Sequence, residues 1–174
     1  MFADQREFDI RCEWGSAGIS ALLPHCDAII IVDVLSFSTC VDIAVGNGAV
    51  VYPYRWRDES AADYARSRDA VLANTRRSFT GFSLSPTSLL RIEEGTRLVL
   101  PSPNGAALSL ATGHVPTFAG CLRNARAAAH AAQTIGARIG VVPAGERWSD
   151  NSSRFAVEDL IGAGAIIDCL PGRR

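Results

Sequence analysis

The segment AIIIVDVLSFSTC, residues 28–40, is the part of the sequence that indicates the fold most clearly. Its first five residues are apolar without interruption, which is typical of a strand covered on both faces in a parallel sheet. Asp33 ends the apolar run, and hydroxyl side chains follow at Ser36, Ser38 and Thr39. The segment therefore predicts a buried strand that brings polar side chains to the carboxyl end of a sheet.

The carboxylate of Asp33 has two interpretations. An aspartate at the end of a buried strand is a suitable ligand for a hard cation such as Mg²⁺, which prefers oxygen. Alternatively, Asp33 or Ser36 is a helix N-cap that accepts a backbone N–H group from the helix that follows. The residues alone leave both interpretations open.

The rest of the chain continues this alternation of apolar runs and polar loops. Short β-branched runs alternate with alanine-rich segments, which predicts an α/β fold. Turn-forming loops follow Asp33, Leu100 and Val142, and we expect them to line one site because ligands bind at the carboxyl ends of parallel strands. The expected strands are 7–12, 28–33, 49–53, 70–73, 97–100, 115–119 and 138–142, and the expected helices are 16–23, 37–46, 59–68, 104–112, 123–135 and 156–169.

Composition excludes several classes of protein. The 174 residues suit a single domain, 1–174, and the net charge of -1 gives no indication of a nucleic-acid or membrane surface. The 17 basic residues are all arginine, which excludes a lysine Schiff base and a Walker-type lysine. The five cysteines are never spaced as CxxC and the N-terminus lacks the apolar core of a signal peptide, so we expect a cytoplasmic protein.

Three further segments carry candidate site residues. Residues 143–164, PAGERWSDNSSRFAVEDLIGAG, place carboxylates beside arginines, which suits a metal and phosphate site. The helix dipole explains Glu158 and Asp159 equally well. The helix start in PSPNG, 101–105, is either an anion site or a plain cap, and residues 75–89 are either a phosphate-binding or a solvated loop.

Five blocks in this order resemble the 2-phosphosulfolactate phosphatase family: VDVLSFSTCVDIAVGNGAVVYP, GFSLSP, LPSPNGAAL, GCLRNARAAA and AGERWSDNSSRFAVEDLIGAGAIID. The resemblance spans nearly the whole chain. It implies a three-layer α/β/α sandwich around a mostly parallel or mixed sheet. It also implies Mg²⁺-dependent hydrolysis of 2-phosphosulfolactate to sulfolactate and phosphate, a step of coenzyme M biosynthesis. The combination of AGERW with EDLIGAGAI is similar to a bacterial branch of the family.

The residues and the resemblance together define the expected site. The expected metal ligands are Asp33, Glu158 and Asp159, and these three with Glu146 are the expected catalytic residues. The expected substrate contacts are Ser36, Ser38, Arg76, Asn104, Gly105, Asn124, Arg147 and Arg154. We expect water to attack the phosphate directly, because the chain lacks a cysteine or histidine nucleophile motif; an aspartyl-phosphate through Asp33 remains an alternative.

Two departures from the family pattern add alternatives to the expected function. Ser36 stands where the family has an arginine, and family members tend to run on past the EDLIGAGAIID helix, so a C-terminal portion is expected to be absent. The alternatives are a phosphatase for a different small phosphoester and a non-catalytic member that binds an anion or forms an oligomer. We expect a small phosphorylated acid as substrate, a homodimer, and neither nucleic acid nor membrane as partner.

Overall fold

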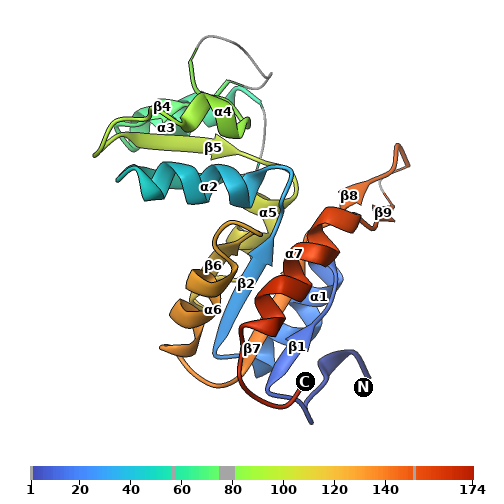
Figure 1. Cartoon of the computed structure of the whole chain (residues 1–174). Helices are drawn as coiled ribbons and strands as arrows, with labels where there is room; N and C mark the ends of the chain where they lie inside the picture. Colours follow the sequence, from blue (N-terminus) through green and yellow to red (C-terminus); the bar gives the residue numbers. More distant parts are fainter. Residues whose placement is uncertain (1, 56–57, 75–80, 151) are drawn as a thin grey trace.

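The computed structural model describes residues 2–55, 58–74, 81–150 and 152–174. Its main strands form two parallel sheets with helices packed against them, and Figure 1 shows the smaller sheet above the larger one. The predicted α/β class is confirmed, and the layers are consistent with an α/β/α sandwich. The division of the strands between two sheets was not predicted, because periodicity identifies a strand without identifying its neighbour.

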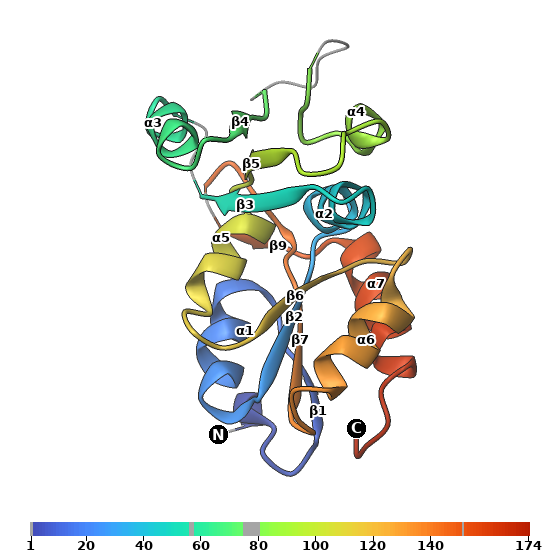
Figure 2. The same cartoon turned by 90° about the vertical axis from the view of Figure 1, so that its left-hand side faces the viewer.

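The larger sheet is entirely parallel. Its strand order is β1 (Ile10–Cys12), β7 (Ile139–Pro143), β2 (Ala28–Val32) and β6 (Thr117–Gly120). Its helices are α1 (Gly15–Leu22) and α5 (Gly105–Ala111) on one face, and α6 (Ala125–Gln133) and α7 (Val157–Asp168) on the other (Figure 2). Because both faces are covered, every residue of β2 and β7 is buried.

Strand β2 divides its side chains between the two faces. Ala28, Ile30 and Val32 belong to the apolar cluster that includes residues of α6 and α7. Ile29 and Ile31 belong to the cluster on the α1 side. This follows from the period of two in a strand, so an uninterrupted apolar run has a partner for each side chain.

The smaller sheet is also parallel but less covered. Its strand order is β3 (Val50–Tyr54), β5 (Arg97–Pro101) and β4 (Val71–Leu72). Its helices are α2 (Phe37–Gly46), α3 (Ser60–Ser67) and the short α4 (Pro86–Leu89). Phe37, Leu89, Leu98 and Leu100 form the centre of its apolar cluster, whereas β3 is exposed or half-buried along its whole length.

Helices α2 and α5 connect the two sheets. α2 contacts β6 of the larger sheet and β3 of the smaller one, and α5 contacts β2 and β3. Both helices begin at the carboxyl end of a strand, α2 after β2 and α5 after β5. The carboxyl ends of both sheets therefore face the junction between them (Figure 1).

All seven predicted strands and all six predicted helices are present, with shorter bounds at most ends. The structure adds 3-10 turns at Phe2–Asp4 and Leu23–His25, helix α4, and the hairpin of β8 (Glu146–Arg147) and β9 (Ser153–Arg154). The five cysteines, all within the described residues, are free thiols. Among the described helices, none has the length and apolar character needed to cross a bilayer.

Candidate functional site

Asp33 is buried directly after β2 and accepts hydrogen bonds from two helix starts. Its Oδ1 accepts the N–H of Phe37, the first residue of α2, at 3.1 Å. Its Oδ2 accepts the N–H of Gly105, the first residue of α5, at 2.8 Å. Asp33 therefore accepts a backbone N–H from the helix that follows, as the helix-cap interpretation expects, although the N-cap position itself is occupied by Ser36. It also accepts an N–H from α5, whose N-cap position is occupied by Asn104.

Electrostatics make the Asp33 carboxylate less acidic than usual. Burial raises its pKa most, and the negative charge of Glu146 raises it further. The N–H groups of Phe37 and Gly105 and a hydrogen bond with the Ser102 side chain lower the pKa, but burial outweighs them. Asp33 and Glu146 thus repel each other electrostatically.

Asp159 is a second buried carboxylate that holds two loops. It lies in the first turn of α7, and its Oδ1 accepts the N–H of Val34 at 2.8 Å. Its Oδ2 accepts the N–H of Gly145 at 2.9 Å, so Asp159 joins the loop after β2 to the loop after β7. Burial, together with the charges of Asp33 and Glu158, raises the pKa of Asp159 to about 6.

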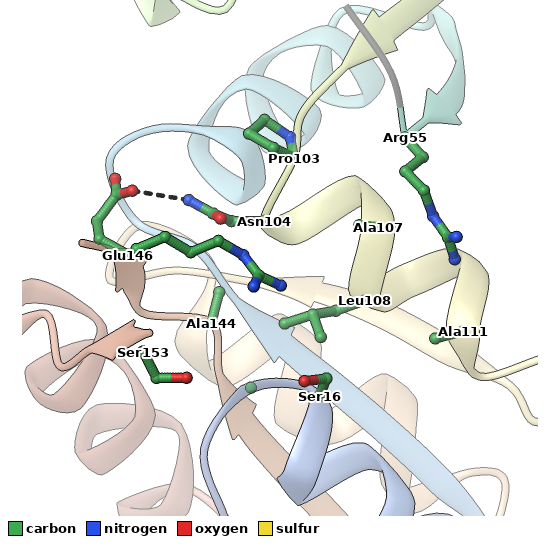
Figure 3. A pocket seen from close by; sticks show the side chains of 12 residues that line it. Ser16, Arg55, Pro103, Asn104, Ala107, Leu108, Ala111, Ala144, Glu146 and Ser153 are labelled. Carbon is green, nitrogen blue, oxygen red and sulfur yellow. Dashed lines mark hydrogen bonds between the residues drawn. The ribbon is translucent and has the colours of Figure 1, made fainter. Parts of the chain in front are cut away.

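A hollow of about 380 Å³ opens where the carboxyl ends of both sheets meet (Figure 3). Loops after β1, β3, β5 and β7 contribute to its wall. Of the three loops expected to line one site, those after Leu100 and Val142 do so, whereas no residue of the loop after Asp33 is among the lining residues. Its lining residues are Gly15, Ser16, Arg55, Pro103, Asn104, Ala107, Leu108, Ala111, Ala144, Glu146, Arg147 and Ser153.

Glu146 and Asn104 form the polar end of this hollow. The Nδ2 of Asn104 donates to Oε2 of Glu146 at 2.8 Å, as the dashed line in Figure 3 marks. Asn104 immediately precedes Gly105, whose N–H is bound by Asp33. Asp33 thus lies behind the wall of the hollow, whereas Glu146 is part of that wall.

The two arginines of the β8–β9 hairpin are placed differently. Arg147 lines the hollow beside Glu146. Arg154 is paired with Glu146 in the hairpin register, but its guanidinium stacks over the ring of Trp148, 5.6 Å from the ring centroid. The hairpin therefore brings one of its two predicted arginines to the hollow.

A sequence model of one family, described as 2-phosphosulpholactate phosphatase, matches residues 20–173. This chain belongs to the 2-phosphosulpholactate phosphatase family. It is 32% identical over 145 residues to the 2-phosphosulfolactate phosphatase of Methanothermobacter thermautotrophicus, a match covering 82% of this chain and 61% of that protein. It is 29% identical over 148 residues to a probable 2-phosphosulfolactate phosphatase of Carboxydothermus hydrogenoformans, covering 82% and 60%. The chain thus spans about three fifths of the length of these relatives.

Two hydroxyl residues predicted as substrate contacts lie away from the hollow. Ser36 is buried and its hydroxyl donates to the carbonyl of Leu84 at 2.9 Å. Ser38 is fully buried, and its hydroxyl donates to the carbonyl of Ile31 and accepts the N–H of Asp33. Because these hydroxyls bind backbone groups, the placement of neither side chain supports the predicted substrate contact.

Asn124, Glu158 and Arg76 complete the set of predicted residues. Asn124 binds Cys121 N–H and the Ala119 carbonyl within its own turn before α6, and it lines a separate hollow beside α6. Glu158 is half-buried beside Asp159 and does not line the main hollow. Arg76 lies outside the described residues.

Sequence reasoning missed Arg55 and Ser16, which also line the hollow. Ser16 is in the first turn of α1, after β1, and Arg55 directly follows β3. The signal for Arg55 was present, because strand 49–53 was predicted and Arg55 lies just beyond its carboxyl end. The sequence did not show that β3, a strand of the smaller sheet, ends at the hollow that loops of the larger sheet also line.

The acidic residues can be compared with the ligands that the expected Mg²⁺ would need. Among the described residues, no group of three or more His, Cys, Asp or Glu side chains could enclose a metal ion. Mg²⁺ usually binds one or two carboxylates and completes its shell with water and substrate phosphate. Asp33 and Glu146 suit this partial role because both are oxygen ligands and because a cation would offset their mutual repulsion.

Proposed function

We propose that this family member hydrolyses a small phosphomonoester in the hollow at the junction of the two sheets, with 2-phosphosulfolactate as the first candidate. The observation that carries the proposal is the set of polar side chains at one end of the hollow. There the Glu146 carboxylate, the Asn104 amide and the Arg147 side chain meet, and buried Asp33 lies behind them. Carboxylates beside arginine and amide donors are suited to activating water and binding phosphate.

Arg147 and Asn104 are the proposed phosphate-binding residues. A guanidinium can donate two parallel hydrogen bonds to phosphate oxygens, and both residues lie on the wall that carries Glu146. The amide of Asn104 already donates to Glu146, so its position is fixed before substrate arrives. Such preorganised donors stabilise the charge of the transferring phosphoryl group.

Glu146 is the proposed residue that orients the attacking water and accepts its proton. Its side chain lines the hollow, and Asn104 holds one of its two carboxylate oxygens. Asp33 is less suited to form an aspartyl-phosphate, since it is 7% exposed and each of its oxygens accepts an N–H. This placement favours direct attack by water over the covalent alternative.

Asp33 and Glu146 are the residues proposed to hold Mg²⁺. The second lone pairs on their oxygens are the available ligands, because each oxygen of Asp33 already accepts one hydrogen bond. When bound, Mg²⁺ would supply neutralisation of phosphate charge and acidification of a bound water. In this proposal Asp159 has a different task, since it fixes the loops that carry Val34 and Gly145.

Three finer assignments remain proposals. The bacterial branch has no support from similarity, because the archaeal relative is 32% identical and the bacterial one 29%. The homodimer and the cytoplasmic location are likewise expectations. A size-exclusion measurement with light scattering on the purified protein tests the dimer.

The test of the proposed function is phosphate release from 2-phosphosulfolactate and a panel of small phosphoesters, with Mg²⁺ and with EDTA. We expect turnover that requires Mg²⁺ and that falls about 100-fold or more in Glu146→Gln, because general-base catalysis contributes roughly that factor. Asp168→Asn, at the exposed end of α7, is the matched control. Turnover in EDTA, or a Glu146→Gln variant as active as the wild type, contradicts the proposal.

A non-catalytic anion-binding role is the second candidate. The observation in its favour is that both oxygens of Asp33 accept backbone N–H groups, which is sufficient for a purely structural aspartate; Arg147 and Arg55 in the lining would then hold the anion. Thermal stabilisation by Mg²⁺ and inorganic phosphate without turnover on any ester of the panel would support this role. Turnover by the wild type would exclude it.

A further inference from the structure

We propose that Arg55 binds the second acidic group of the substrate, a sulfonate or carboxylate attached near the phosphate, and thereby sets specificity. This inference rests on the proposed function. Arg55 follows the last residue of β3 and lines the hollow. Figure 3 shows its side chain reaching into the hollow from the side opposite Glu146 and Asn104.

The wall between these two ends is apolar. Helix α5 contributes Ala107, Leu108 and Ala111 to the lining. Asn104 and Ala111 are seven residues apart along the helix, which corresponds to about 10 Å at 1.5 Å per residue. A hollow with two polar ends and an apolar wall between them suits a molecule in which a short carbon skeleton separates two anionic groups.

The charges distinguish the two ends. One end holds Glu146 and Arg147, with buried Asp33 behind them, so an anionic group would bind there through the arginine and the cation proposed for the two carboxylates. Arg55 comes from the other sheet and places a positive charge on the opposite side. The phosphate is therefore assigned to the carboxylate end with Arg147, and the acidic group that binds no metal is assigned to Arg55.

Arginine also has the right shape for this second group. Its planar guanidinium matches two oxygens of a carboxylate or sulfonate, which a lysine ammonium cannot do. Arg55 is exposed, and the small side chains of Ala107 and Ala111 leave the space beside α5 open. A substrate lacking the second acidic group would leave this contact unmade.

The test compares two substrates in Arg55→Ala, Arg55→Lys and a control, Arg91→Ala. Arg91 is an exposed arginine in the turn after α4 that does not line the hollow. For 2-phosphosulfolactate we expect kcat/KM to fall about 10- to 100-fold in Arg55→Ala, mainly through KM, because one charged hydrogen-bonded contact is lost. For phenyl phosphate, which lacks a second acid, we expect kcat/KM to stay within about threefold. Arg55→Lys should recover part of the loss.

Each other result contradicts the assignment. An equal loss on both substrates would mean that Arg55 binds the phosphate, and no loss on either would mean that it binds neither group. If the wild type turns over no ester, the proposed function fails, and binding of sulfoacetate by calorimetry still tests Arg55. Sulfoacetate should bind the wild type and Arg91→Ala but not Arg55→Ala; equal binding to all three, or none to the wild type, overturns the assignment.

Discussion

The larger and the smaller sheet contribute different residues to the same hollow: the loop after β7 supplies Glu146 and Arg147, and the end of β3 supplies Arg55. In the larger sheet, β2 and β7 are completely buried, and the loops after them carry Asp33 and Glu146. In the smaller sheet, β3 is exposed or half-buried throughout and is followed by Arg55. The covered sheet thus carries the acidic groups together with Arg147, whereas the less covered sheet carries Arg55.

The physical chemistry of burial explains this difference. A buried carboxylate requires hydrogen-bond donors, and the crowded carboxyl end of the larger sheet provides backbone N–H groups to Asp33 and Asp159. Arg55 lies at an exposed strand end, where a charged head can stay at the surface. Substitutions in the two sheets should therefore have effects of different size.

The largest effect is expected for Asp159→Ala. This change removes the acceptor for the N–H groups of Val34 and Gly145, both of which are buried contacts. Leaving two buried donors unpaired should lower the free energy of unfolding by about 3 kcal/mol. Urea denaturation followed by circular dichroism measures the change, and Asp168→Ala, 87% exposed at its side chain, should change stability by less than about 0.5 kcal/mol.

An Asp159→Ala variant as stable as Asp168→Ala would show that the loops after β2 and β7 hold their positions without this carboxylate. In that case Asp159 would be available for the metal-binding role predicted from the sequence. The variant thus separates the structural and the metal-binding interpretations of the pair Glu158 and Asp159.

The sequence predicted the elements of the fold better than their arrangement. The run at 28–33 became a fully buried strand, because an apolar segment without alternation requires cover on both faces. Nothing in the periodicity showed that β3, β4 and β5 would form a sheet of their own. The short hairpin of β8 and β9 was missed because two-residue strands leave no measurable pattern.

The site was predicted in part for a related reason. Residues after strands, such as Asp33, Asn104 and Glu146, could be recognised because strand ends are visible in the sequence. The sequence does not show which hydroxyl side chains point into the protein interior. Ser36 and Ser38 were therefore expected at the hollow, but their hydroxyls bind backbone carbonyls. Arg55 was overlooked since its strand belongs to the second sheet.

A matched pair of valines tests the difference between the sheets directly. Val141 in β7 is fully buried and pairs with Ile30, whereas Val50 at the start of β3 is 48% exposed. Val141→Ala should lower the free energy of unfolding by about 2.5 kcal/mol through lost burial and a cavity, and Val50→Ala by about 1 kcal/mol or less. Equal losses in urea denaturation would mean that the smaller sheet is covered in solution, for example by a second copy of the chain.

Gly105 lies at the point where the two sheets are joined, and Gly105→Ala probes that junction. A Cβ at this position would lie 2.4 Å from Cδ1 of Phe37 and 2.7 Å from Oδ2 of Asp33. Phe37 is buried in the smaller sheet's cluster and Asp33 is held by two helix starts, so neither can move freely. Overpacking of this kind should lower the free energy of unfolding by about 2 kcal/mol.

Gly164→Ala is the control for this substitution. Gly164 lies in the interior of α7, and a Cβ there would have no heavy atom within 4 Å. Because alanine restricts the unfolded chain more than glycine does, this variant should gain about 0.5 to 1 kcal/mol. Urea denaturation of both variants should therefore give changes of opposite sign. A Gly105→Ala variant that is as stable as the wild type or more stable would show that Asp33 and Phe37 yield to a methyl group, and that the two helix starts are not fixed by this carboxylate.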